Sequence, residues 1–265
     1  MVAIMIKKIL EERITSNQKI AEGIYRMTIY APEIAQNCTP GQFVNLYPRG
    51  RHTLLPRPIS LCKIEEEHIT LVYGIVGQGT QEFSGYTQGQ GIRISTAQGN
   101  GFDLGPNIKK SEYGVAGQVT LVGGGLGVPP LVALAEALIK QGHRVRVICG
   151  FRAEPFLIEA FTTLDVSLHV TTDSGDYGFK GTVMDYIRAY PLSSEYYFAC
   201  GPKPMLSELT AYCRQKQVTL QVSMEERMGC GYGACLGCVC KTKDGNKKVC
   251  SDGPVFLGEE VDWHA

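Results

Sequence analysis

The sequence has no excess of charge of one sign and no long apolar run. Its 26 Lys and Arg residues balance 26 Asp and Glu residues. Proteins that neutralise nucleic-acid phosphates need clustered cations, so this class is excluded. No apolar run approaches the roughly 20 residues that span a bilayer, and Glu11 and Glu12 follow too early for a signal-peptide core. We therefore expect a cytoplasmic protein that binds neither nucleic acid nor membranes.

The sequence also lacks tandem repeats and low-complexity linkers. Its 265 residues are enough for two medium domains, and 44% hydrophobic residues with 20% charged residues are typical of an ordinary globular protein. Without a linker, the regions of the chain are expected to pack closely against one another.

Cysteine, in contrast, is plentiful, and half of it lies in one short segment. Of ten cysteines, five lie within residues 230–250, and the others are scattered singly. A disulfide framework spreads its cysteines through a small secreted chain. A dense group at one end of a larger chain indicates a metal site instead. The five are Cys230, Cys235, Cys238, Cys240 and Cys250.

The spacing of these cysteines predicts a [2Fe–2S] cluster. Cys230-x4-Cys235-x2-Cys238, followed by Cys250, has the order of plant-type ferredoxins. Small residues at positions 229, 231, 233, 234 and 237 allow the backbone to wrap closely round the sulfurs. Cys250 is preferred to Cys240 as the fourth ligand, because Cys238 and Cys240 are too close for both to bind easily. The alternative is a four-cysteine zinc site, although zinc sites usually use two close cysteine pairs.

The first hundred residues favour a β-sandwich or barrel, because short apolar runs alternate with Gly, Pro, Asn and charged residues. Arg57-Pro58-Ile59-Ser60 begins one strand after a Pro-rich approach. Val72–Gly74 and Gly79–Thr80 are further candidate ligand-binding edges. From the residues alone, Arg57 is either a phosphate ligand or a surface cation. The expected strands are Tyr25–Tyr30, Gln42–Leu46, Ile69–Val76 and Ile92–Ser95.

From Gln118 the pattern alternates between strands and helices, which predicts a doubly wound parallel sheet. The last 40 or so residues are rich in Cys and Gly and show little periodicity. The expected strands are Gln118–Val122, Val145–Cys149, Val166–Val170, Tyr196–Ala199 and Thr219–Ser223. The expected helices are Val128–Lys140, Ala153–Phe161, Thr182–Ala189 and Pro204–Arg214.

Two loops of this sheet are candidate nucleotide-binding loops. Gly123–Pro130 (GGGLGVPP) and Ala199–Met205 (ACGPKPM) each follow an expected strand and precede a helix. In a parallel sheet both lie at the carboxyl ends of strands, where ligands bind. Glycines let the backbone approach a pyrophosphate, and a helix N-terminus offers free N–H groups to it. The alternatives are a simple tight turn and, for Cys200, a small buried hydrophobic side chain.

These motifs together resemble a known family. Arg57–Ser60, Gly123–Pro130 and Cys200–Met205 are similar, in order and spacing, to the ferredoxin–NADP reductase superfamily across almost the whole chain. Met224–Cys240 (MEERMGCGYGACLGCVC) closely resembles electron-transfer subunits of the NAD-dependent, two-subunit (B-type) dihydroorotate dehydrogenases. Ile59 departs from the pattern, since many reductases of the superfamily carry a Tyr packed on the flavin there.

The resemblance implies three domains: an N-terminal Greek-key FAD barrel (residues 1–105), an α/β nicotinamide domain (residues 106–223) and a small [2Fe–2S] domain (residues 224–265). It implies a catalytic partner that holds FMN and oxidises dihydroorotate, in a heterotetramer of two catalytic and two electron-transfer subunits. Electrons would pass from the partner through the cluster and FAD to NAD⁺, in pyrimidine (UMP) biosynthesis.

The resemblance also implies roles for single residues. Arg57 would pair with the FAD pyrophosphate. Ser60, near the flavin ring, and Cys200, near the nicotinamide, are the catalytic candidates. The other expected FAD contacts are Pro58, Ile59, Val72, Tyr73, Gly74, Gly79 and Thr80. The expected NAD contacts are Gly123, Gly124, Gly125, Gly127, Cys200, Gly201 and Pro202, and the expected iron ligands are Cys230, Cys235, Cys238 and Cys250.

Two other functions fit part of these patterns. One is a related FAD/[2Fe–2S] reductase subunit of a hydrogenase or a ferredoxin-dependent transhydrogenase. The other is a nucleotide-sensing module with a zinc-stapled tail. The choice between NAD and NADP is not settled by the residues, although Glu154 beside Arg152 is placed to accept ribose hydroxyls and repel a 2′-phosphate.

Overall fold

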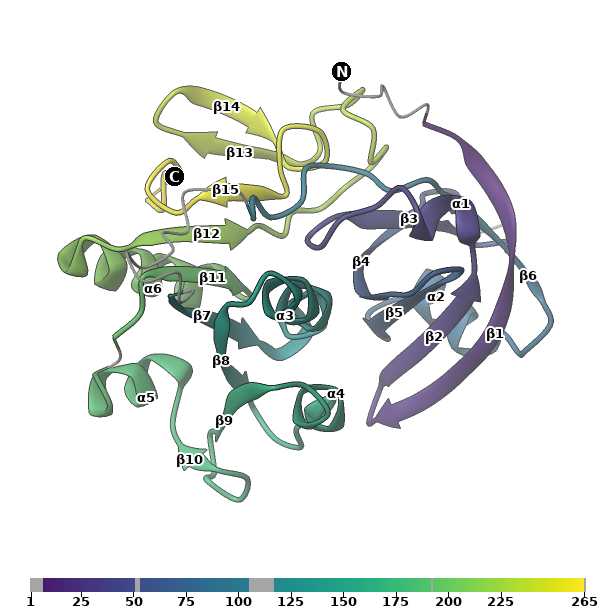
Figure 1. Ribbon diagram of the computed structural model, residues 1–265. Coiled ribbons are helices and arrows are strands. Elements are labelled where there is room, and N and C mark those ends of the chain that lie inside the picture. Colours follow the sequence, from purple (N-terminus) through teal and green to yellow (C-terminus); the bar gives the residue numbers. More distant parts are fainter. Residues whose placement is uncertain (1–6, 51–52, 105–116, 192, 265) are drawn as a thin grey trace.

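The computed structural model describes residues 7–50, 53–104, 117–191 and 193–264. A closed barrel and an α/β sheet lie side by side, and the C-terminal segment, yellow in Figure 1, lies along the sheet and next to the barrel strand β3. The expected boundary at residues 105 and 106 lies outside the described residues, as do the first six residues of the N-terminus.

The N-terminal barrel is six-stranded, closed and antiparallel, in the order β1-β2-β5-β4-β3-β6, which confirms the expected Greek-key barrel. Alternate residues of β5, such as Ile69 and Leu71, point into its core. Strand β1 was not expected from the sequence, because Ile14 is its one fully buried residue and polar residues flank it on both faces. The strands are β1 (Ile9–Ala21), β2 (Ile24–Tyr30), β3 (Phe43–Tyr47), β4 (Arg57–Ile64), β5 (His68–Gly74) and β6 (Gly91–Ser95), with helices α1 (Pro32–Ala35) and α2 (Gln78–Ser84).

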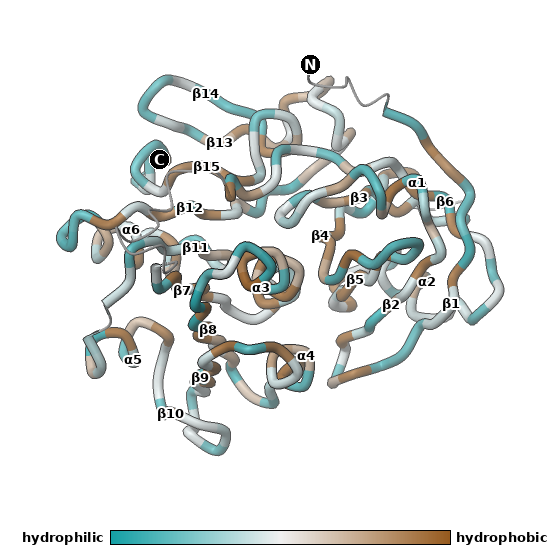
Figure 2. The backbone as a smooth tube through the Cα atoms, in the orientation of Figure 1, coloured by the Kyte–Doolittle hydropathy of each residue, from teal (hydrophilic) through white to brown (hydrophobic). Residues whose placement is uncertain are grey.

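The second sheet has seven strands in the order β10-β9-β8-β7-β11-β12-β15, and all pairs except β12–β15 are parallel. Its central strands β7 and β11 are buried along almost their whole length, and hydrophobic residues follow one another in the second half of β8 (Figure 2). Helices α3 and α4 cover one face, and α5 and α6 cover the other. The elements are β7 (Gln118–Gly124), α3 (Pro130–Lys140), β8 (Arg144–Phe151), α4 (Ile158–Thr162), β9 (Val166–Thr172), β10 (Phe179–Lys180), α5 (Val183–Ala189), β11 (Tyr196–Cys200), α6 (Lys203–Lys216) and β12 (Thr219–Ser223).

One expected helix differs from the structure. The predicted helix Ala153–Phe161 is wrong in its first half, because α4 begins only at Ile158. Strand β8 continues to Phe151, and the rings of Phe151 and Phe156 pack edge to face at 5.0 Å between centroids. Pro155 disfavours a helical conformation at Glu154, and Leu157 takes a left-handed φ of 62° just before the helix begins.

The C-terminal segment leaves the α/β sheet and returns to it. It forms a hairpin of β13 (Val239–Thr242) and β14 (Gly245–Lys248), and then β15 (Val255–Leu257) pairs antiparallel with β12. The Met224 N–H donates to the Pro254 carbonyl at 2.9 Å, so the two ends of the segment between them are held together. Cys238, Cys250 and Phe256 share a hydrophobic cluster with α5 and α6. The segment therefore shares its core with the α/β sheet. No helix among the described residues combines the length and the apolar character needed to cross a membrane.

Candidate cofactor sites

The two predicted nucleotide-binding loops come together at the carboxyl ends of β7 and β11. A Cβ atom built on Gly127 would lie 2.2 Å from the carbonyl oxygen of Cys200, so only glycine allows this approach. Gly124 lies in the same way against Pro202 and Met205. Gly123 packs closely against Val128 and Leu131 of the α3 region, and Gly125 has a positive φ of 54° with open space beside it. The two loops that the sequence predicted therefore lie directly against each other, and we call their contact the junction.

A cavity of about 600 Å³ opens over this junction. Gly124–Gly127, Gly201 and Pro202 line one side of it, and residues of the segment 150–156 line another. Its volume and glycine-rich wall fit a nicotinamide nucleotide. The sequence analysis did not identify Thr171, Asp173, Gly181, Thr182 and Val183, which also line it. Thr171 and Asp173 lie at the carboxyl end of β9, and that position could have identified them.

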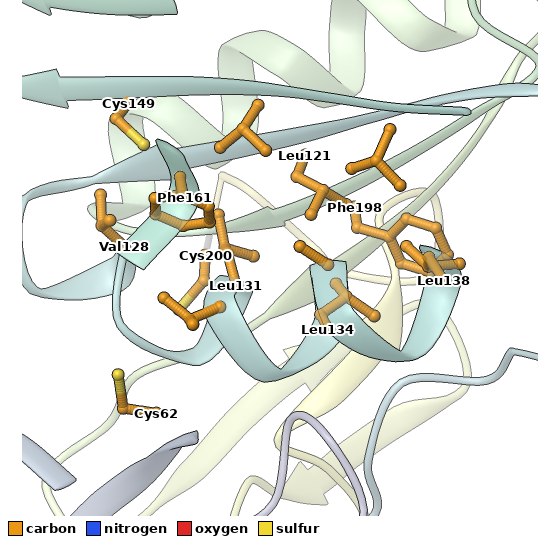
Figure 3. Packing of buried hydrophobic residues seen from close by; sticks show 14 of the residues in the cluster. Cys62, Leu121, Val128, Leu131, Leu134, Leu138, Cys149, Phe161, Phe198 and Cys200 are labelled. Atoms are coloured by element: carbon orange, nitrogen blue, oxygen red, sulfur yellow. The ribbon is translucent and has the colours of Figure 1, made fainter. Parts of the chain in front are cut away.

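Cys200, one of the two catalytic candidates, is buried in the structure. Its side chain is 1% exposed and packs with Leu131 and Phe198 beneath α3 (Figure 3). Burial raises the pKa of its thiol far above the usual range. In this structure the residue presents its backbone to the junction through the contact with Gly127, while its thiol is part of the core.

Arg57 and Gly79, which lie on different elements, are in contact. A Cβ atom on Gly79 would come within 2.6–2.8 Å of the Arg57 guanidinium, which therefore lies over the first turn of α2. The Arg57 Nη1 donates to the Leu55 carbonyl at 2.7 Å, which orients the side chain. A guanidinium and helical N–H groups on one patch fit a pyrophosphate.

The other residues predicted to contact FAD lie in different surroundings. Thr80 is buried, and its hydroxyl accepts the N–H groups of Val76 and Gly77 at 3.0 and 3.3 Å, so it holds the loop that leads into α2. The Tyr73 ring lies in the barrel core, and its hydroxyl donates to Asn17 at 3.1 Å. Val72 packs toward α3. Gly74 touches Leu126 of the Gly123–Pro130 loop, so the two halves of the predicted site meet there.

Ser60 lines a second cavity, of about 220 Å³, between the barrel and the end of β12. Phe43 and Pro58 form its barrel side, and Met224, Glu225 and Met228 form the opposite side. Ser60 pairs with Phe43 across β3 and β4, so both side chains face the same way. Ile59 instead packs against the barrel core. We call this space the flavin cavity, because it is lined by Ser60, which the resemblance places near the flavin ring.

Glu225 lines both the flavin cavity and the larger nucleotide cavity, and the sequence analysis did not identify it. The surrounding protein desolvates its carboxylate and raises its pKa. Glu225 lies within the Met224–Cys240 motif, but no local pattern assigns it this role, since its position depends on β12 ending beside both cavities.

Replacing Arg57 with Ala should weaken FAD binding without unfolding the chain. A charge-assisted hydrogen bond is worth about 1.5–3 kcal/mol, which corresponds to about one to two decades in affinity. Gly79→Ala should act in the same direction by displacing the guanidinium, whereas Gly77→Ala meets no atom within 4 Å on extended backbone (φ 178°) and should bind FAD normally. Flavin fluorescence during dilution measures the affinity. Parent-like FAD retention by Arg57→Ala would identify Arg57 as a surface cation.

Three of the four predicted iron ligands lie on one loop, residues 229–238, which we call the cluster loop. The fourth, Cys250, lies beside this loop. The thiols interact in two pairs, Cys230 with Cys235 and Cys238 with Cys250, since each pair shares an effect on pKa. Two pairs match two irons that each bind two thiolates. Among the described residues, no group of three or more Cys, His, Asp or Glu side chains is arranged to hold a single metal ion.

Backbone N–H groups point at these sulfurs. Tyr232 and Cys235 each donate to Cys230 Sγ at 3.4 Å, and Gly233 donates to Cys250 Sγ at 3.1 Å. Burial alone would raise the pKa of Cys230, but the donated hydrogen bonds lower it to about 6. Burial and the contact with Cys238 raise the pKa of Cys250 to about 12. The N–H donors stabilise sulfur anions, as an iron–sulfur cluster requires.

Cys240, the candidate ligand set aside in favour of Cys250, lies on β13. It lines a separate cavity of about 400 Å³ together with Lys203, Glu226 and Trp263. Burial raises the pKa of its thiol. This position supports Cys250 as the fourth ligand.

Comparison with known proteins agrees with this geometry. Residues 225–262 match the iron–sulfur cluster binding domain of dihydroorotate dehydrogenase B. The electron transfer subunit of dihydroorotate dehydrogenase B (NAD(+)) from Caldanaerobacter subterraneus is 37% identical, over 95% of this chain and 98% of that protein. The protein of the same name from Bacillus pumilus is 41% identical, over 94% of this chain and 96% of its own length. The chain belongs to this family.

Among solved structures, an NADH-dependent reduced ferredoxin–NADP oxidoreductase studied for flavin-based electron bifurcation has a TM-score of 0.83 and 31% identity, over 96% of this chain and 90% of that chain. A dihydroorotate dehydrogenase B electron transfer subunit is thus built on a fold that other flavin-dependent reductases share. The family membership confirms the resemblance drawn from the Met224–Cys240 motif and the expected cofactor set of FAD, NAD and a [2Fe–2S] cluster. The roles of single residues remain predictions.

Proposed function

We propose that this chain transfers electrons to NAD⁺ from a partner that holds FMN and oxidises dihydroorotate, in pyrimidine biosynthesis. The observation that carries the proposal is the order of the three sites. The flavin cavity shares Glu225 with the nucleotide cavity on one side. Met228, two residues before Cys230, lines the same flavin cavity. The flavin cavity therefore adjoins both the nucleotide cavity and the segment that carries the cysteines.

This order fits the electron count. A bound flavin exchanges one or two electrons, whereas NAD⁺ takes two as hydride and a [2Fe–2S] cluster carries one. The protein's task is to hold the groups in place, and no side chain has to act as an acid or base. Arg57 neutralises pyrophosphate charge, Ser60 faces the flavin cavity, and the Gly123–Gly127 and Cys200–Pro202 backbones bind the nicotinamide nucleotide. Cys230, Cys235, Cys238 and Cys250 bind the cluster.

NAD rather than NADP is the proposed nucleotide. Glu154 and Asp173 line the larger cavity, and Arg152 is the cation beside them. Two carboxylates repel a 2′-phosphate and accept ribose hydroxyls. The proposal also includes a cytoplasmic location and a heterotetramer of two catalytic and two electron-transfer subunits.

The function is tested by mixing the purified holoprotein with an FMN-containing dihydroorotate dehydrogenase subunit encoded beside it. We expect dihydroorotate-dependent reduction of NAD⁺ that requires both proteins, and gel filtration should give the mass of a two-plus-two assembly. Parallel assays with reduced ferredoxin and with hydrogen address the related reductase subunits. Electron delivery from either donor, with none from dihydroorotate, would contradict the proposal in favour of that alternative.

A further inference from the structure

Strand β3 turns a buried asparagine toward the cluster loop. Val44 and Leu46 point into the barrel core, so Phe43, Asn45 and Tyr47 point outward. A Cβ atom on Gly231 would lie 2.3 Å from Asn45 Nδ2 and 2.6 Å from its Oδ1. The side-chain amide therefore lies against the residue that follows Cys230.

This amide has no hydrogen-bond partner among the residues that the structure describes. Asn45 is 0% exposed, and among the described residues neither Nδ2 nor Oδ1 makes a hydrogen bond. The position of the residue is nevertheless fixed, because its backbone N–H donates to Ser95 Oγ at 2.9 Å. A buried polar group without a partner costs free energy, so such a group usually has a partner that the protein itself does not supply.

Asn45 also lies toward the flavin cavity. It pairs directly with Pro58 across β3 and β4, and Pro58 lines that cavity. The amide thus lies between the flavin cavity and the loop that carries Cys230 and Cys235. Of the groups proposed to bind here, the sulfur atoms of the cluster are strong acceptors close to Gly231.

We propose that the Asn45 side-chain amide donates a hydrogen bond to a cluster sulfur beside Cys230 and raises the reduction potential of the cluster. Reduction adds one negative charge to the cluster, and a donor aimed at sulfur stabilises the more negative form. Asn45 is therefore a positioning and tuning residue, in contact with the one-electron carrier but outside its ligand set. This inference rests on the proposed ligand set.

The test is an EPR-monitored redox titration of the holoprotein. Asn45→Leu keeps the approximate shape and removes the donor. We expect the equilibrium constant for one-electron reduction of the cluster to fall about tenfold, which is about 59 mV toward more negative potential. Asn45→Asp places an acceptor-only side chain there and should shift the potential further in the same direction. Iron content, the FAD potential and NADH oxidation with an artificial dye should match the parent.

Tyr47→Phe is the matched control. The Tyr47 hydroxyl contacts the Tyr232 hydroxyl of the same loop, and its removal loosens the loop without touching the amide. Its cluster should titrate at the parent potential. An unchanged potential in iron-loaded Asn45→Leu overturns the inference, and so does an equal shift in Tyr47→Phe. Loss of iron from both Asn45 variants with FAD retained also overturns it, because a tuning contact is not needed for assembly. A parent protein without a [2Fe–2S] spectrum would instead refute the proposed ligand set.

Discussion

A Cys235→Ser variant should keep much of its NADH–dye activity and lose dihydroorotate-dependent reduction of NAD⁺. NADH delivers hydride to the flavin directly, so oxidation of NADH by an artificial acceptor requires only the nucleotide and flavin cavities. In the proposed path, electrons from dihydroorotate arise on the partner and reach the flavin through the cluster. Partner-dependent activity should therefore fall to the background rate, while FAD content and NADH–dye turnover remain close to those of the parent.

The comparison needs two controls. Loss of a metal centre can unfold the residues around it, so assembly with the partner is checked by gel filtration before the rates are compared. Cys240→Ser is the matched variant, because Cys240 lies on β13 and lines a different cavity. It should keep both its iron and its partner-dependent activity. Normal NAD⁺ reduction by an assembled complex without a cluster would refute the proposed electron path.

The second large effect is expected from Gly127→Ala. The added methyl group would overlap backbone atoms of Cys200 and Gly201 at 2.2–2.5 Å, and backbone cannot move aside as a flexible side chain can. One of the two nucleotide-binding loops must then shift. A displacement of about 1 Å at a reacting centre costs about 100-fold in rate, so NADH–dye activity should fall by about two decades. FAD and cluster spectra should be retained.

Gly142→Ala separates this effect from general destabilisation. Gly142 lies in the same domain with a positive φ of 86°, and nothing lies within 4 Å of an added Cβ. The variant should lose about 1 kcal/mol of stability from its backbone conformation and keep its NADH–dye activity. Stopped-flow reduction of the flavin by NADH measures both variants. A parent-like rate in Gly127→Ala would mean that the two loops do not need their close approach.

The parts that the sequence predicted are those that depend on local patterns. Glycines in strand-to-helix loops, alternating apolar residues and the Cys230–Cys238 spacing are each visible within a short segment. They located the barrel, the parallel sheet and the group of cysteines in the C-terminal segment. The approach of Gly127 to Cys200 could also be predicted, because the carboxyl ends of parallel strands lie at one edge of the sheet and bring both loops there.

The parts that it missed depend on contacts between distant segments. Glu225 has its position because β12 ends between two cavities, and Asn45 matters because β3 passes under the cluster loop. Neither relation appears in any window of sequence. The late start of α4, in contrast, has a local cause, because Pro155 disfavours a helical conformation at Glu154.

The contacts that hold the two ends of the C-terminal segment together bear on the order in which the chain folds and acquires its cluster. The Met224–Pro254 hydrogen bond and the pairing of β15 with β12 hold residues 225–253 at both ends, and their apolar residues pack into a core that α5 and α6 already build. The fold of residues 225–253 can therefore form before iron binds. Delivery of iron and sulfide then becomes a late, local step, and mild chelation followed by reconstitution should be reversible without a refolding cycle.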